Sequence, residues 1–140
     1  MSADEYRPLG GHWVRVEGDL VRLRVKGVIS VQDMAEFMRL QAAVRREQGW
    51  VFMLYDSREN TGLDPAARKY ATEHTTSESR VDAAASFGAP FSMRVLVNML
   101  NRARVVLGKP GTPVELFNTE AEARQYLESE RRRLRPSVAA

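Results

Sequence analysis

The strongest constraint on the fold is an unbroken apolar run, Trp50 to Tyr55, that ends at Asp56. An apolar run without alternation is typical of a strand buried on both faces, which is the usual state of a central strand in a parallel sheet. The polar segment 57–63 follows, and Asp64-Pro65 then predicts a helix start with an N-cap and a first-turn proline. We therefore expect a central parallel strand, a loop over residues 57–63, and a helix that begins at Asp64.

The segment after this run is the first candidate for a functional site. In open α/β sheets, ligands and partners bind at the carboxyl ends of the parallel strands. We therefore predict that the loop binds a protein partner. The candidate contact residues are Asp56, Ser57, Arg58, Glu59, Asn60, Thr61 and Asp64.

Carboxylates in the same segment offer a catalytic alternative. Asp56, Glu59 and Asp64 are close enough in sequence to meet around the loop, where they could hold Mg²⁺ or exchange protons. A structural role is favoured, because Asp56 ends the strand and Asp64 is placed to cap the helix. We therefore expect no catalytic residue, no metal site and no cofactor.

Residues before the central strand predict a β-hairpin. His12–Glu17 and Leu20–Val25 alternate between apolar and polar residues, and Gly18-Asp19 between them suits a tight turn. Gly27 is expected to end the second strand. The first strand is expected to form an edge of the sheet, where its charged side chains prevent pairing with other chains.

Capping signals predict two further helices. Ser30 and Asp33 form a variant capping box, so a helix is expected from Ser30 until Gly49 stops it. Thr119 and Glu122 form a second capping box, which starts the last helix of the chain.

Two short segments, Val81–Phe87 and Val114–Phe117, complete the set of predicted strands. The order ββαβαβαβα predicts an α/β fold with a mixed, mostly parallel sheet of about five strands, an antiparallel edge strand and helices packed on the sheet. We expect one domain over residues 12–134, preceded by a flexible lead (1–11) and followed by a disordered tail (135–140).

The helix predicted over Phe91–Leu107 is more apolar than a surface helix needs. Its apolar arc spans roughly 160° on a helical wheel, whereas a helix that only covers a sheet needs somewhat over 100°. We predict that a second protomer, a protein partner or an apolar ligand covers the rest, with a neighbouring helix of the same chain as the alternative. The candidate interface residues are Phe91, Val95, Leu96, Met99, Leu100 and Ala103.

Composition limits the classes of function. The absence of cysteine removes disulfides, thiol nucleophiles and thiolate metal ligands, and it favours a cytoplasmic location. The acidic N-terminus does not form a signal peptide, and no stretch approaches the roughly 20 apolar residues that span a bilayer. We therefore expect no integral membrane segment.

Other motifs for chemistry are also missing. His12 and His74 have no metal-ligand spacing and are expected to be ordinary surface or boundary residues. No Gly-x-Ser-x-Gly elbow or Gly-rich phosphate loop occurs, so neither acyl transfer nor nucleotide binding is expected. Much of the net charge of +3 comes from the run Arg131–Arg135, which we interpret as a solvated helix end rather than a nucleic-acid site.

Taken together, these elements resemble the STAS domain, and more closely its SpoIIAA-like sub-branch, which is grouped in fold with CRAL-TRIO lipid-binding domains. The likeness covers roughly residues 12 to 130. It rests on the leading hairpin, the entry into a helix at Gly27–Ser30, the apolar strand ending in Asp56, the helix start Asp64–Arg68, and the ending Leu116–Ala123.

The resemblance implies a non-enzymatic regulatory module. Anti-sigma-factor antagonists of this family bind a kinase-like partner, gated by a phosphorylatable Ser in an Asp-Ser-Ser-Gly-type motif at the start of the second helix. Here the matching region is Asn60–Pro65, with Asp64 in place of that Ser. We therefore expect a regulatory interaction module without the usual phosphoacceptor, which binds a protein partner, forms a homodimer, or does both. The alternative is a module that binds a lipid or another apolar small ligand.

Overall fold

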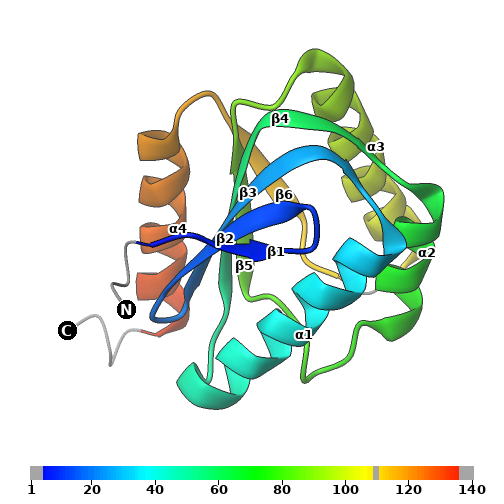
Figure 1. Cartoon of the computed structure of the whole chain (residues 1–140). Coiled ribbons are helices and arrows are strands. Elements are labelled where there is room, and N and C mark those ends of the chain that lie inside the picture. Colours follow the sequence, from blue (N-terminus) through cyan, green and yellow to red (C-terminus); the bar gives the residue numbers. More distant parts are fainter. Residues whose placement is uncertain (1–4, 109–110, 136–140) are drawn as a thin grey trace.

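One sheet of six strands organises residues 5–108 and 111–135, the parts of the chain that the computed structural model describes. The elements in chain order are β1 (Arg7–Leu9), β2 (His12–Glu17), β3 (Leu20–Ile29), α1 (Val31–Gln48), β4 (Phe52–Leu63), α2 (Pro65–His74), β5 (Ala83–Phe87), α3 (Phe91–Leu107), β6 (Val114–Phe117) and α4 (Glu120–Leu134). The strands lie side by side in the order of the sequence (Figure 1). The pairs β1–β2 and β2–β3 are antiparallel, and the strands from β3 to β6 pair in parallel, which confirms the mixed, mostly parallel sheet.

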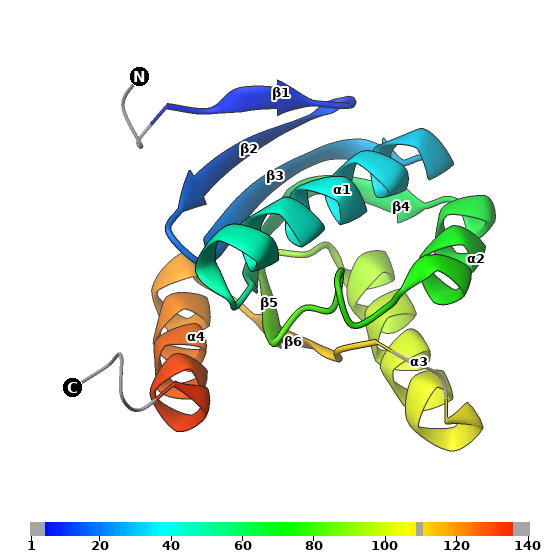
Figure 2. The same cartoon turned by 90° about the horizontal axis from the view of Figure 1, so that it is seen from below.

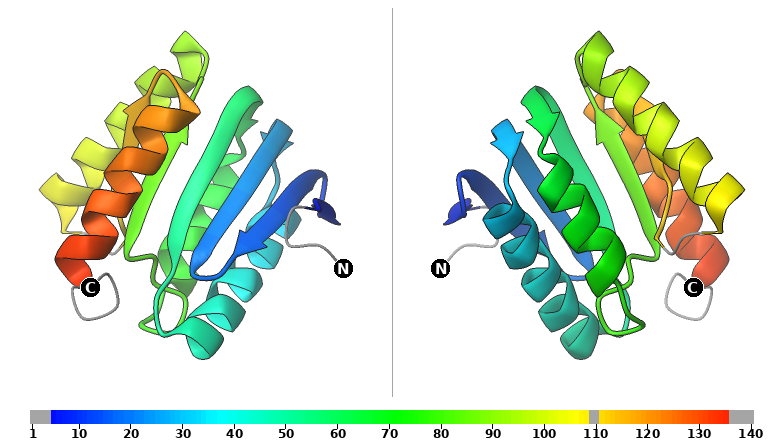
Figure 3. Two further views of the ribbon diagram at one scale, coloured as in Figure 1. Left: turned by 90° about the vertical axis from the view of Figure 1, so that its left-hand side faces the viewer. Right: turned by 90° about the vertical axis from the view of Figure 1, so that its right-hand side faces the viewer.

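The helices form a layer on each face of this sheet. The strands from β3 to β6 advance in one direction, and parallel crossovers are right-handed, so α1, α2 and α3 are placed on the same face. α4 follows the last strand and packs on the opposite face, as the two views of Figure 3 show. Among the helices of the described residues, none has the length and apolar character that crossing a membrane requires.

β4 supplies side chains to the hydrophobic cores on both faces. Met53 and Val51, the latter directly before β4, belong to the buried cluster beneath α1 and α2, and Phe52 and Leu54 belong to the cluster beneath α4. All four residues are buried. The interpretation of this apolar run as a central parallel strand is therefore confirmed.

The predicted helix starts are confirmed by their hydrogen bonds. The Asp33 N–H donates to Ser30 Oγ at 3.1 Å, and the Ser30 N–H donates to Asp33 Oδ2 at 3.0 Å. Asp64 caps α2, because its carboxylate accepts the Ala66 N–H at 3.0 Å. The second capping box is present at the start of α4.

The predicted loop over residues 57–63 is wrong, because β4 continues as a strand to Leu63. The reason lies in its neighbour. Gly27, expected to end β3, adopts a φ of 75° beside a register shift, and β3 continues to Ile29. Ile29 then pairs with Leu63, so the polar segment obtains its backbone hydrogen bonds from the sheet.

The ends of the chain also differ from the expectation. Arg7–Leu9, placed in the flexible lead, form β1, so β1 rather than β2 is the edge of the sheet. Arg135, placed in the disordered tail, donates to Asp19 Oδ2 at 2.5 Å and lies over the ring of Trp50. The rest of the predicted lead and tail, residues 1–4 and 136–140, lies outside the described residues.

His12 is not a surface residue, because β1 and the start of α1 cover it and leave 1% of it exposed. Its Nδ1 accepts the Lys26 N–H at 3.0 Å, so Nε2 carries the proton and donates to Asp33 Oδ2 at 2.9 Å. Asp33 also accepts the Gly11 N–H at 3.1 Å. Burial acts to raise the pKa of Asp33, but these hydrogen bonds and those from Ser30 outweigh it and hold the pKa below its ordinary value.

We predict that Asp33→Ala lowers the free energy of unfolding by about 2 to 3 kcal/mol, because the substitution leaves several buried donors without an acceptor. Asp64→Ala removes a single cap hydrogen bond and should cost about 1 kcal/mol. Urea unfolding monitored by circular dichroism measures both values. Equal losses in the two variants would contradict the role given to Asp33.

Candidate functional site

The predicted contact residues of β4 do not form one surface. Side chains alternate along a strand, so Asp56 and Arg58 lie on the face covered by α4, whereas Ser57 lies on the face of α1 to α3. A register shift after Asp56 interrupts the alternation, and Asn60 lies on the same face as Ser57. The structure thus divides the predicted set between two environments.

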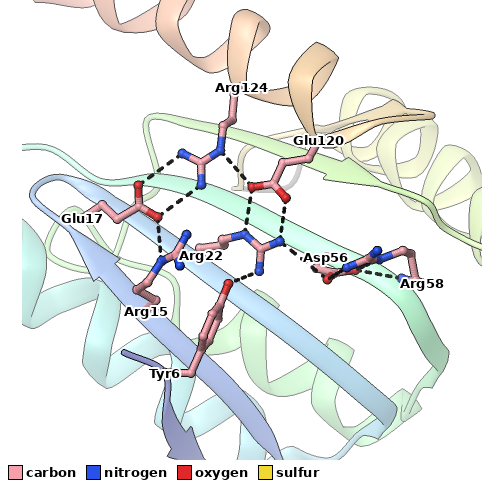
Figure 4. Close-up of polar contacts among 8 residues, drawn as sticks. All are labelled: Tyr6, Arg15, Glu17, Arg22, Asp56, Arg58, Glu120 and Arg124. Carbon is pink, nitrogen blue, oxygen red and sulfur yellow. Dashed lines mark hydrogen bonds and ion pairs between the residues drawn. The ribbon is translucent and has the colours of Figure 1, made fainter. Parts of the chain in front are cut away.

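Asp56 belongs to a buried charge network with Arg22 and Glu120 (Figure 4). The guanidinium of Arg22 donates to both carboxylate oxygens of Glu120, at 3.0 and 2.7 Å, and lies 3.7 Å from Asp56 Oδ2. It also donates to the Tyr6 hydroxyl. On the other side of Asp56, Arg58 makes two side-chain hydrogen bonds to the carboxylate, at 2.9 and 2.7 Å.

The network continues along α4 and β2. Arg124 Nε donates to Glu120 at 2.9 Å, and both of its terminal nitrogens donate to Glu17 at 3.2 Å. Arg15 completes the series through a 3.0 Å hydrogen bond to Glu17. Acidic and basic groups therefore alternate across this face, and each carboxylate has cationic partners (Figure 4).

These contacts shift the pKa values of the acidic groups. The hydrogen bond from Arg22 is the main cause that lowers the pKa of Glu120 to about 2, and Arg124 adds to it. Burial acts to raise the pKa of Asp56, but the hydrogen bonds from Arg58 and the charge of Arg22 outweigh it and lower the pKa. Both carboxylates are held as anions, and together they neutralise the buried Arg22, which is a structural use of charge.

The carboxylates predicted as an alternative catalytic set do not meet. Asp56 is engaged by Arg22 and Arg58, Glu59 lies 3.6 Å from Arg24, and Asp64 caps α2. Across residues 5–108 and 111–135, no group of three His, Cys, Asp or Glu side chains is arranged to hold a metal ion.

The remaining predicted contact residues differ in exposure. Ser57 is buried and shares a 2.7 Å hydrogen bond with Ser86, and Asn60 is buried and accepts the Gly62 N–H at 3.1 Å. Arg58, Glu59 and Thr61 are exposed, and Asp64 is half-buried. The exposed residues are the members of the predicted set that a partner can reach directly.

The arginine run at the end of α4 is paired rather than simply solvated. Arg131 donates to Asp19 at 2.6 and 3.1 Å, and Arg133 donates to Glu130 at 2.8 and 2.9 Å. Asp19 therefore joins the β2–β3 turn to the end of α4.

α3 presents an apolar surface to solvent. Phe91, Val95 and Met99 are 82%, 50% and 54% exposed. Val106 lies on the same side at helical spacing and is 80% exposed. We call these four residues the outward strip; the other predicted interface residues, Leu96, Leu100 and Ala103, are half-buried.

The sequence analysis missed a cavity of about 220 Å³ between the sheet and α1, α2 and α3. Small side chains form part of its wall, with Ala84 and Ser86 on the sheet, Ala71 on α2 and Thr75 directly after α2. The sequence signal for this cavity is the small size of these side chains, because they cannot fill the space between the sheet and the helices. In Figure 2, α1 lies over β3 and β4, whereas α3 lies towards β6.

Comparison with known proteins gives one match to a family model and several to solved structures. The family model, described as SpoIIAA-like, matches residues 20–128, most of the chain. None of the curated proteins compared with the chain matches it.

Two solved structures illustrate the likeness. The first is the anti-sigma factor antagonist SpoIIAA in its unphosphorylated form, with a TM-score of 0.54 and 11% identity over 83% of this chain and 96% of that one. The second is an uncharacterized DUF3478-family protein from Shewanella loihica PV-4 with a SpoIIAA-like fold, with a TM-score of 0.54 and 18% identity over 91% of this chain and 98% of that one. At such identities the likeness shows a shared fold, which confirms the α/β architecture expected from the sequence.

We predict that Arg22→Gln lowers the free energy of unfolding by about 3 kcal/mol, because it leaves buried Asp56 and half-buried Glu120 without their shared cation. Arg58→Gln is the matched control, since Arg58 also pairs with Asp56. The side chain of Arg58 is 63% exposed against 8% for Arg22, and its loss should cost within about 1 kcal/mol. Urea unfolding near neutral pH compares the variants, and an equal effect would contradict the buried role of Arg22.

Glu120 also predicts how stability depends on pH. Its pKa in the folded protein is about 2, below the ordinary value of 4.5, so its contribution is present above pH 4.5 and is lost as pH falls towards 2. Glu120→Gln should therefore reduce stability near neutral pH and make the acid loss less steep. Unfolding curves across this pH range test the prediction, which fails if the variant and wild-type profiles run parallel.

Proposed function

The chain belongs to the SpoIIAA-like family, and on that premise we propose that it is a non-enzymatic protein-interaction module that self-associates through the outward strip of α3. The observation that carries the proposal is the exposure of four large apolar side chains on one side of a single helix. Contiguous exposed apolar surface of this kind marks interaction sites in soluble domains.

The spacing of the outward strip suits a symmetric dimer. Phe91, Val95 and Met99 are four residues apart, so they form a continuous ridge along α3. In an antiparallel pairing of two copies of α3 with the two-fold axis between Val95 and Met99, Val95 of each copy contacts Met99 of the other. By the same symmetry Phe91 lies opposite Ala103 of the second copy, whose small side chain leaves room for the ring.

The phosphorylation switch of the related antagonists is not part of the proposal. Asp64 occupies the helix-start position where the family motif carries a phosphorylatable Ser, and its carboxylate is used by the Ala66 N–H. A fixed negative charge at this helix start supplies no group to phosphorylate. We therefore propose that binding is constitutive.

The exposed end of β4 is a second surface that is predicted to contact a protein partner. Arg58, Glu59 and Thr61 lie at the carboxyl end of a central parallel strand, where partners of such sheets bind. A protein partner at this edge and a second copy on α3 would use separate surfaces. A cytoplasmic location likewise remains a prediction.

We predict that the wild-type protein has twice the monomer mass in light scattering after gel filtration. Val95→Glu and Met99→Glu should each weaken the dimer at least about tenfold, because a charge cannot be buried in an apolar interface without a partner. Asn98→Glu is the matched control, since it adds the same charge to the polar side of α3 and should leave the dimer intact. Circular dichroism checks that every variant is folded; a wild-type protein that stays monomeric at all concentrations would refute self-association.

A further inference from the structure

The cavity beneath α1, α2 and α3 has walls suited to an apolar chain. It is lined by Val25 and Ile29 of β3, Phe37 of α1, Leu63 of β4 and Val97 of α3. Its volume of about 220 Å³ lies below the roughly 300 to 1,000 Å³ that is typical of sites for drug-sized ligands. The space therefore suits a small, narrow ligand.

A cation without a carboxylate partner lies at the edge of this cavity. Arg104 of α3 is half-buried and lines it, and in the described part of the chain no Asp or Glu forms an ion pair with it. Its Nη1 donates to Asn101 Oδ1 at 3.2 Å and to the Thr112 carbonyl at 3.1 Å. These acceptors are neutral, and burial lowers the pKa of Arg104. Arg22, the arginine buried on the opposite face, is by contrast paired with the carboxylate of Glu120.

Tyr55 supplies a second donor beside Arg104. Its side chain lines the cavity, and its hydroxyl has no hydrogen-bond partner among residues 5–108 and 111–135. Burial raises the pKa of Tyr55 to about 12, although the nearby charge of Arg104 acts in the opposite direction. The phenol is therefore a neutral donor close to a guanidinium.

A second hollow, of about 560 Å³, joins the cavity between α2 and α3, and Leu63, Leu100 and Arg104 line both. Arg68 also lines this outer hollow, and its Nε is buried without a hydrogen-bond partner in the described residues. The acidic residue of the hollow, Glu73, lies 3.9 Å from Lys69. The two adjoining hollows thus contain two guanidinium groups, of Arg68 and Arg104, that form no ion pair with a carboxylate in the described part of the chain.

Because Gly111 has no Cβ, the side chain of Arg104 can lie directly beside it. Its φ is 125°, and a Cβ at this position would lie 2.9 Å from Arg104 Nε. The guanidinium is therefore held in place by the shape of the segment before β6 rather than by an ion pair.

We propose that this cavity binds a small amphiphilic carboxylic acid, with its alkyl chain against the apolar walls and its carboxylate on Arg104 and Tyr55. An alkyl chain matches the apolar lining, and a carboxylate supplies a negative charge for Arg104, whose present acceptors are neutral, and an acceptor for the Tyr55 hydroxyl. A neutral lipid would leave the guanidinium unpaired. The inference goes beyond self-association, because the cavity uses the inward side of α3 and the outward strip uses the opposite side.

The test is isothermal titration calorimetry near neutral pH with octanoate, and with 1-octanol as the neutral ligand of the same chain length. We expect octanoate to bind at least about tenfold more tightly than 1-octanol, because hydrogen bonds to charged groups are stronger than those to neutral ones. Arg104→Gln should remove this preference, and Tyr55→Phe should reduce it. Arg94→Gln, which removes an exposed arginine of the same helix, should keep it.

The ligand comparison needs no variant, so it remains decisive if Arg104→Gln does not fold. Titrations of Val95→Glu separate this inference from self-association, because the monomeric variant should still bind octanoate. No binding by hexanoate, octanoate or decanoate would overturn the proposal. Equal binding of octanoate and 1-octanol would overturn it as well, because the carboxylate would then contribute nothing.

Discussion

The parallel pairing of β4 with β3 and β5 is the constraint on which the rest of the structure depends. Parallel neighbours need crossover connections, and right-handed crossovers between strands that advance in one direction place α1, α2 and α3 on the same face. Among the described residues of α3, one, Met93, is buried against that face. The outward strip and the cavity both follow, because α3 covers its part of the sheet without closing over it.

The opposite face of the sheet is covered in a different way. α4 covers only part of it, and charged side chains fill the space beside the helix. The guanidinium of Arg22 lies over the ring of Phe87 while its nitrogens serve Glu120 and Asp56. Buried charges are tolerated only when they are paired. Asp56 follows an apolar strand, a position typical of functional residues, but its role here is structural.

Interpretation of the sequence succeeded where neighbouring residues carry the whole signal. Ser30 with Asp33, and Asp64 before a proline, specify helix starts through hydrogen bonds within one turn, and the structure contains both. It failed where the partner is distant. His12 is buried by α1, and Leu63 is held in β4 by Ile29. The segment 57–63 has a loop's composition, but an extended β3 offers it a full set of backbone hydrogen bonds.

Local sequence therefore determined the order of the elements, the central strand, the caps and the excess apolar surface of α3, since each depends on periodicity or on contacts a few residues long. The tertiary structure decided which carboxylates are neutralised, that Tyr55 and Arg104 meet at one cavity, and which apolar residues of α3 stay in solvent. These outcomes depend on side chains brought together from distant strands and helices. Their pairing is set by the registers and packing of the sheet, which no short stretch of sequence specifies.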